Sequence, residues 1–351
     1  MHFDTTPVRT GEELNLASLA DWLRGRIAGV DRGIAVDQFP SGHSNLTYLL
    51  RIDGREYVLR RGPLGPVAPN AHDMARKFRM LDMVQPHFRE APDVCHLCED
   101  PAVLGVVFFL MERRHGFVLR DEVPLQLANA PNYARRASEA FIDCLIRLHA
   151  IDVSKTGLIA LGKPEGFLER QVLGWADRWN RAQTGAKTEE MPKMDGVIRW
   201  LVDRRPSSPA PTLVYNDYRL DNVMFGAESE DGAESACRIE AALDWEMATV
   251  GDPLADLGLT LCYWAWADAP QLRALELPAL TSHPGWYTRD QFVQRYAEPT
   301  GRDLSQIGYY EVLGVFKLAV ILQQIYYRFR LGQTWDARFQ NFGFQGTGAD
   351  P

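Results

Sequence analysis

The sequence predicts an α+β protein of two lobes: an N-terminal lobe built on a five-stranded antiparallel sheet, and a larger, mainly helical C-terminal lobe. The chain has 351 residues, which is too long for one simple hydrophobic core. Up to Met111 most apolar runs are short and of strand length, and after Met111 the apolar residues recur mainly at the spacing of a helix face. These observations favour two units of different secondary structure.

The N-terminal region carries the signals for the sheet. An apolar stripe from Leu16 to Ile27 predicts a first helix, and Asp53-Gly54 is typical of a type I′ turn between two strands. The predicted strands cover residues 34–39, 46–52, 55–60, a segment near Val94, and 105–111; a second helix covers about 71–85.

The C-terminal region carries mainly helical signals. A stripe from Ala137 to Leu148 predicts a helix, and another should cover residues 309–330. A short strand over 212–215 leads into a polar loop, and residues 223–225 and 239–243 read as a hairpin. We place the lobes at residues 1–111 and 117–351 and the hinge at 112–116.

Composition and charge exclude several classes of protein. A net charge of −8 argues against a nucleic-acid binder, and five irregularly spaced cysteines do not form a disulfide framework. No signal peptide is visible, and the longest strongly apolar run, from Leu104 to Met111, is far shorter than the roughly 20 residues that span a bilayer. We expect a soluble cytoplasmic protein that binds neither membrane nor nucleic acid; the sequence leaves a homodimer open.

The most informative residues are Asp217, Asn222 and Asp244. Phosphoryl transfer needs a carboxylate at the attacking hydroxyl, an acidic metal ligand and a neutral oxygen ligand. Asp217 and Asn222 lie five residues apart in one loop, and Asp244 ends the following hairpin strand. Magnesium prefers such hard oxygen donors. The alternative for the first two is a satisfied turn, which Asp and Asn favour anywhere.

The segment from Val214 to Val223, together with Leu243-Asp-Trp-Glu246, resembles the catalytic loop and the metal-binding aspartate of the aminoglycoside/choline kinase family. The similarity covers about residues 34–335 and includes Gly251-Asp-Pro-Leu-Ala-Asp-Leu-Gly258. It is strongest with the kinase-like domains associated with acyl-CoA dehydrogenases, because of Arg219-Leu-Asp-Asn222 and Phe39-Pro-Ser-Gly-His-Ser-Asn-Leu-Thr-Tyr48.

This resemblance implies a bilobal protein-kinase-like fold that uses ATP and Mg²⁺. It implies that Asp217 is the catalytic base and that Asn222 and Asp244 are the magnesium ligands. We group Arg219, from the same motif, with Asp217 as catalytic. Asp252 suits a helix N-cap, and Asp256 should brace the catalytic loop.

Three N-terminal segments are candidates for nucleotide contacts. Gly42, Ser44 and Asn45 lie in a loop between two strands, where kinases cover the phosphates, although an ordinary polar hairpin loop looks the same. Arg60 ends the third strand, where kinases carry a phosphate-binding lysine; Arg61 competes with it if the register is one residue off. Met111, Glu112 and Arg113 resemble the interlobe hinge that contacts adenine.

Two departures from the family pattern bear on activity. Tyr215-Asn216 replaces the usual His-Gly, although asparagine can adopt the positive φ that glycine provides. Tyr215 could also replace the hydrogen bonds of the lost histidine. On the second predicted helix Lys77 stands where a glutamate should pair with Arg60, and Asp73, one turn earlier, could serve instead.

Other polar and aromatic residues have structural interpretations. His149 should cap a helix C-terminus. A group of aromatic residues should lie mainly in the core, although some of them could line an acceptor pocket: Tyr263, Trp264, Trp266, Trp286 and Tyr287.

These residues together predict a magnesium-dependent phosphotransferase that moves the γ-phosphate of ATP to a small hydroxylated metabolite. The dehydrogenase-associated relatives suggest a hydroxyacyl thioester or a hydroxy acid as the acceptor. The alternative is a nucleotide-binding pseudokinase that regulates a partner.

Overall fold

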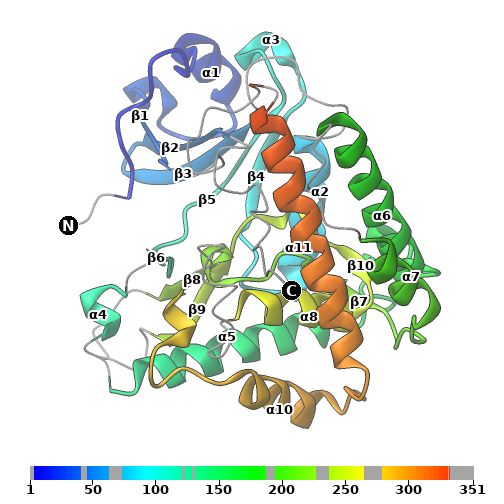
Figure 1. Cartoon of the computed structure of the whole chain (residues 1–351). Helices are drawn as coiled ribbons and strands as arrows, with labels where there is room; N and C mark the ends of the chain where they lie inside the picture. Colours follow the sequence, from blue (N-terminus) through cyan, green and yellow to red (C-terminus); the bar gives the residue numbers. More distant parts are fainter. Residues whose placement is uncertain are drawn as a thin grey trace. The chain divides into compact units, whose positions relative to one another are not determined.

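The computed structural model describes residues 4–40, 46–62, 73–120, 123–128, 131–186, 194–226, 237–264, 279–330 and 332 (Figure 1). The chain divides into two compact units. The first comprises residues 1–117, 224–227 and 239–246, and the second comprises the rest. The segments 224–227 and 239–246 come from the part of the sequence for which the second lobe was predicted.

The first unit contains the predicted five-stranded antiparallel sheet, with strand order β1-β2-β3-β5-β4. Its strands are β1 (Ala35–Gln38), β2 (Leu46–Ile52), β3 (Arg55–Arg61), β4 (Val94–Cys98) and β5 (Phe108–Glu112). The turn between β2 and β3 has positive φ at Asp53 (50°) and Gly54 (78°), which confirms the predicted hairpin.

The two faces of this sheet pack against different helices. On one face, α1 (Leu16–Leu23) buries Leu19 and Leu23 in a cluster with Leu50, Leu59 and Phe108. On the other face, α2 (Met74–Val84) contacts β4 and β5. Because strand side chains alternate between faces, Arg60 lies on the α2 side and Arg61 on the α1 side.

Short elements complete the first unit. They are η1 (Val30–Arg32), η2 (Gln85–His87), α3 (Pro101–Leu104), β6 (Gly116–Phe117), β8 (Val223–Gly226) and β9 (Ile239–Ala242). The last three strands form a sheet in the order β6-β8-β9. A Cβ on Gly116 would lie 2.1 Å from the carbonyl oxygen of Phe225, so this close pairing needs a glycine.

The second unit is mainly helical, as predicted. Its helices are α4 (Leu125–Ala128), α5 (Tyr133–His149), η3 (Leu158–Leu161), α6 (Phe167–Ala186), α7 (Asp195–Asp203), η4 (Leu220–Asn222), α8 (Pro253–Tyr263), η7 (Ala279–Ser282), α10 (Arg289–Thr300) and α11 (Ile307–Arg330). Two short strands, β7 (Thr212–Val214) and β10 (Thr249–Gly251), pair antiparallel. Along the chain, one boundary between the two units falls after Glu246, within the turn η6 (Trp245–Met247).

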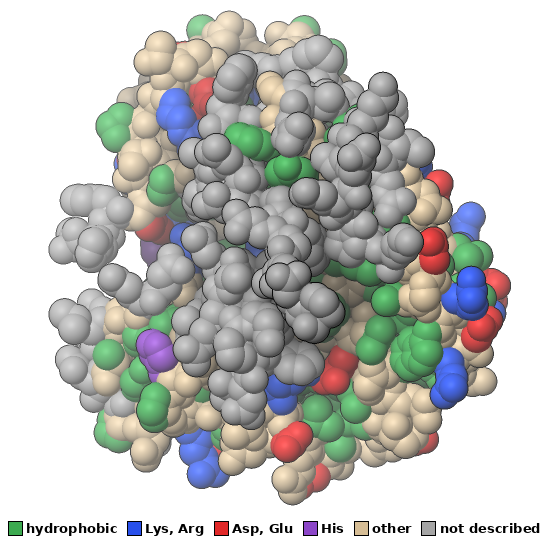
Figure 2. Space-filling model, in the orientation of Figure 1, with side chains coloured by type: hydrophobic (Ala, Val, Ile, Leu, Met, Phe, Trp, Pro, Cys, Tyr) green, Lys and Arg blue, Asp and Glu red, His purple; other side chains and the backbone are tan. Residues whose placement is uncertain are grey.

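Helix α11 runs along α8 and also contacts α6 (Figure 1). By length and composition alone it could cross a membrane, but the core helices of soluble proteins pass the same test. On the face drawn in Figure 2, the described acidic and basic side chains lie interspersed.

Candidate active site

The first unit brings Arg60 to the carboxylate of Asp244. Arg60 Nη2 lies 3.3 Å from Asp244 Oδ1 and 3.6 Å from Glu246 Oε1. Asp244 directly follows the β9 hairpin and has a φ of 59°, a left-handed conformation that Asp tolerates better than most residues. Burial raises the pKa of Asp244, nearby Arg60 lowers it, and Glu246 raises it further. A bound cation would favour the charged form of this carboxylate.

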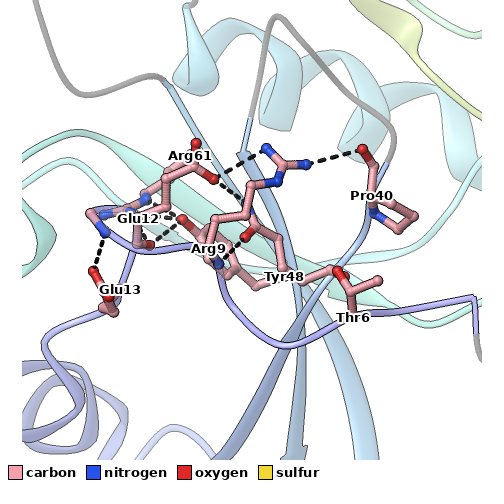
Figure 3. Close-up of polar contacts among 9 residues, drawn as sticks. Thr6, Arg9, Glu12, Glu13, Pro40, Tyr48 and Arg61 are labelled. Carbon is pink, nitrogen blue, oxygen red and sulfur yellow. Dashed lines mark hydrogen bonds and ion pairs between the residues drawn. The ribbon is translucent and has the colours of Figure 1, made fainter.

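Arg61, the competing candidate, is committed to the other face of the sheet. Figure 3 shows its guanidinium beside Tyr48 and Glu12, and only 2 % of Arg61 is exposed. Its Nη2 donates to the Tyr48 hydroxyl at 2.7 Å and to the Glu12 carbonyl oxygen at 2.6 Å. The geometry therefore favours Arg60 as the cation that faces Asp244.

The hypothesis that Asp73 pairs with Arg60 is wrong. Asp73 is the N-cap of α2, and its side chain accepts a hydrogen bond from the Arg76 N–H at 2.8 Å. Lys77 is buried and donates to Glu246 Oε1 at 2.5 Å. The carboxylate shared by Arg60 and Lys77 thus belongs to Glu246, a residue for which the sequence predicted no role.

The hinge candidates Met111, Glu112 and Arg113 lie at the C-terminal end of strand β5. Met111 is buried in β5. The Glu112 N–H donates to the Asp93 carbonyl oxygen at 2.9 Å, so this donor is already used within the sheet. The Arg113 guanidinium lies over the Phe39 ring, 4.9 Å from its centroid, and pairs with Asp4. Gly42, Ser44 and Asn45 lie outside the described residues.

The second unit holds Asp217 and Asn222 in one hydrogen-bonded loop between β7 and β8. Asn222 Nδ2 donates to Asp217 Oδ2 at 2.8 Å and to the Asp217 carbonyl oxygen at 2.9 Å. The Tyr263 hydroxyl donates to Asp217 Oδ1 at 3.1 Å. Arg219 Nε lies 3.6 Å from Asp217 Oδ2. With its nitrogen so engaged, Asn222 presents its amide oxygen as an acceptor.

The Asp217 carboxylate is desolvated yet accessible. Burial raises its pKa, while Arg219, Asn222, Lys317 and Tyr263 lower it. About a quarter of the side chain, 26 %, remains exposed. A carboxylate in this setting accepts a proton more readily than one in water and can still meet a substrate.

Asp256 braces the catalytic loop, as predicted. Its carboxylate accepts from the backbone N–H groups of Tyr215, at 2.5 Å, and Asn216, at 2.7 Å. Asn216 has a φ of 65°, so asparagine does preserve the left-handed turn. The predicted N-cap is also confirmed, because Asp252 accepts from the Leu254 N–H at 2.9 Å.

The ring of His149 makes tertiary side-chain contacts, which corrects the expectation that it caps a helix C-terminus. The ring is buried, with Nε2 3.2 Å from Asp256 Oδ2 and Nδ1 2.7 Å from the Tyr296 hydroxyl. A histidine on α5 therefore contacts the aspartate that holds the loop. This ring lies 107 residues from Asp256 in sequence, so no local motif indicated it.

Lys317 is a further residue that the sequence did not single out. It lies in α11, and its Nζ donates to the Asn216 carbonyl oxygen at 3.0 Å. Burial lowers its pKa to about 8, although Asp217 and Asp256 favour its charge. Its only sequence signal is that a lysine interrupts a strongly apolar helix.

Aromatic residues line a small pocket next to Asp217. The Arg219 guanidinium lies 5.4 Å from the centroid of the Tyr263 ring. Trp264, Thr260 and Thr281 also line this pocket. Trp266 lies outside the described residues.

The oxygen donors fit the expected cofactors. An amide oxygen of Asn222 and a carboxylate of Asp244 are the hard ligands that magnesium prefers. Arg60 supplies a fixed positive charge of the kind that contacts phosphates. Each unit carries a part of this donor set.

The sheet unit, the helical unit and the Asp217–Asn222 loop together define a protein of the protein-kinase-like class. Residues 35–290 match the phosphotransferase enzyme family, and the chain belongs to that family. This finding confirms the resemblance and the fold that were expected from the catalytic motifs.

The curated relatives include acyl-CoA dehydrogenase family members. Member 10 from Mus musculus is 32% identical over 343 residues, which cover 97% of this chain and 31% of that protein. Member 11 from Mus musculus is 30% identical, covering 94% of this chain and 41% of that protein. The chain thus spans about a third to two fifths of the relatives' length.

Solved structures share the fold. A protein from Ralstonia eutropha described as a candidate aminoglycoside phosphotransferase is 29% identical, with a TM-score of 0.74 and 94% of each chain covered. An aminoglycoside phosphotransferase in ternary complex with AMP-PNP and hygromycin B has a TM-score of 0.54, with 94% of this chain and 99% of that chain covered. At 18% identity the latter indicates the fold alone.

Proposed function

We propose that this protein transfers the γ-phosphate of ATP to a hydroxyl group of a small metabolite, with magnesium bound to the triphosphate. The observation that carries the proposal is the environment of Asp217: its carboxylate is desolvated, partly exposed and fixed by hydrogen bonds from Asn222 and Tyr263. The family to which the chain belongs transfers phosphate to small molecules.

Asp217 orients the acceptor hydroxyl and accepts its proton during transfer. Asn222 and Tyr263 each donate a hydrogen bond to one oxygen of the Asp217 carboxylate. These two bonds restrict rotation of the Asp217 side chain and keep it oriented during the reaction. Asp256 and Lys317 hold the backbone of the same loop. Positioning of this kind supplies most of the catalysis in phosphoryl transfer.

Magnesium would be held by Asn222 and Asp244 and, when bound, would neutralise charge on the phosphate oxygens. Arg60 would contact the phosphates as a second source of positive charge. ATP is our choice of donor because a structure of the same fold binds AMP-PNP.

The acceptor we favour is a hydroxyacyl thioester or a hydroxy acid. The motivation is that the matched relatives carry acyl-CoA dehydrogenase names and extend well beyond the region that this chain matches. A kinase domain in such a protein would act on a hydroxylated acyl compound. Aminoglycosides, which are polycations, are the less favoured acceptors.

The test is incubation of the protein with γ-labelled ATP, magnesium and a metabolite library that contains hydroxyacyl-CoAs and hydroxy acids. We expect labelled product with the wild type and a loss of roughly 100-fold or more with Asp217→Asn, because the base is removed. Asp82→Asn, on the exposed face of α2, is the matched control. Magnesium-dependent ATP binding without transfer to any compound would favour the pseudokinase instead.

A further inference from the structure

We propose that Glu246 is a positioning residue for the nucleotide, and that it supplies the carboxylate at the inward face of α2, where the helix itself carries Lys77. The inference rests on the proposed function and extends it to a residue outside the catalytic motif. In this chain the inward position of α2 is a cation, Lys77, and the strand position opposite it is also a cation, Arg60.

Glu246 is the carboxylate that makes this pairing of two cations stable. Its Oε1 lies 2.5 Å from Lys77 Nζ and 3.6 Å from Arg60 Nη2. Lys77 is buried, and burial lowers its pKa while Glu246 raises it. Two buried like charges destabilise each other unless an anion lies between them.

The cluster is electrically balanced in a way that depends on Glu246. Arg60 and Lys77 contribute two positive charges, and Asp244 and Glu246 contribute two negative ones. If Asp244 binds a cation, its charge is no longer available to Arg60. Glu246 then remains to orient Arg60 and to neutralise Lys77, so its role becomes larger when the nucleotide binds.

The backbone around Glu246 is anchored on both sides. The Trp245 indole N–H donates to the Ala242 carbonyl oxygen at 2.8 Å, and its ring packs edge to face on Phe88. Arg76 Nη1 donates to the Glu246 carbonyl oxygen at 3.2 Å. The turn that presents Asp244 is therefore tied to α2 through both the side chain and the backbone of Glu246.

The experiment compares Mg–ATP affinity and ligand-free thermal stability in Glu246→Gln, Lys77→Glu and the double variant, with Glu99→Gln as an exposed matched control. We expect Glu246→Gln to weaken Mg–ATP binding by on the order of 10- to 100-fold, because Arg60 and Lys77 lose the charge of the partly buried carboxylate that they share. The KM for the acceptor should not change.

The double variant separates positioning from a merely structural role. Lys77→Glu alone places a second carboxylate against that of Glu246, and the repulsion between the two should also weaken Mg–ATP binding. Combined with Glu246→Gln, it moves the carboxylate onto α2 beside Arg60 and should recover most of the affinity. Unchanged binding in Glu246→Gln, or a double variant no better than Glu246→Gln, would overturn the inference.

The proposed function can fail separately from this inference. A wild type that binds Mg–ATP but phosphorylates no acceptor would refute the proposed transfer. The binding measurements would still decide the role of Glu246, because they need no acceptor.

Discussion

Lys317 places a charged group in the interior of the helical unit, beneath the catalytic loop. Its ammonium contacts the Asn216 carbonyl oxygen and lies 5.5 Å from the centroid of the Trp175 ring. Desolvation of an ammonium group disfavours its charged form, which explains a pKa lowered to about 8. The residue therefore reduces stability at neutral pH while it fixes the turn that carries Asp217.

This account predicts a pH dependence for Lys317→Met. The pKa is about 8 in the folded protein and about 10.4 in an unfolded chain, so between these values the unfolded chain binds more protons. The free energy of unfolding of the wild type should therefore rise with pH relative to that of the variant. Over the whole interval between the two pKa values the rise should be on the order of 3 kcal/mol. Urea denaturation of both proteins at several pH values from 7 to 10 measures the difference.

If the free energies of unfolding of the two proteins differed by the same amount at every pH, the interpretation of Lys317 as a buried group with a lowered pKa would be contradicted. Comparing the two proteins removes the contribution of the buried tyrosines, which titrate alike in both. Lys317→Arg keeps the charge and should retain more phosphotransferase activity than Lys317→Met.

At the residue scale, the sequence predicted the groups that act through local chemistry. Asn216 could be assigned a positive φ, and Arg60 could be preferred to Arg61 by strand alternation, because both follow from backbone geometry. Lys317 and Glu246 were missed because their contacts join positions 101 and 169 residues apart. Asp73 was wrongly predicted to pair with Arg60. Its carboxylate instead caps helix α2, and Arg60 pairs with Glu246, which is distant in sequence.

At the scale of elements, the crossing of α8 and α11 depends on two glycines. A Cβ on Gly258 would lie 2.6 Å from the backbone carbonyl of Tyr310, and one on Gly314 would lie 2.7 Å from Cys262 Sγ. A backbone group cannot move aside as a flexible side chain can. The close approach of these helices keeps α11, and hence Lys317, next to the catalytic loop.

Gly258→Ala should consequently destabilise the protein by roughly 1–3 kcal/mol, the usual range for overpacking. Gly174→Ala is the matched control, because Gly174 is exposed in α6, a Cβ there would have no atom within 4 Å, and alanine favours a helix. Thermal denaturation should give a lower midpoint for the first variant and an equal or higher one for the second. Equal midpoints for the two variants would argue against close packing at the crossing.

Strands were predicted better than helix ends. The hairpin signal at Asp53-Gly54 fixed the positions of β2 and β3 almost to the residue. The first helix ends at Leu23 instead of continuing to Ile27, because Arg24 leaves the helical conformation and Gly25 has a φ of 75°. Apolar periodicity continues past a helix end when the following turn still packs on the core.

At the scale of the whole molecule, the proposed chemistry is divided between the two units. The sheet unit holds Asp244 with Arg60 and Glu246, and the helical unit holds Asp217 with Asn222. The family and the fold were predictable because the catalytic residues lie in two short segments, 214–223 and 243–246, each of which can be recognised locally. The acceptor was not, because the pocket in which we propose that it binds collects side chains from separate helices, such as Phe141 and Thr281.

The measurement that tests this division most directly is calorimetric titration of ATP into the wild type, Asp244→Ala and Asp217→Ala, each with and without magnesium. The account predicts magnesium-dependent binding in the wild type and in Asp217→Ala, which should nevertheless be inactive, and binding weakened by about 10-fold or more in Asp244→Ala. Mg–ATP binding of wild-type strength in Asp244→Ala would contradict it.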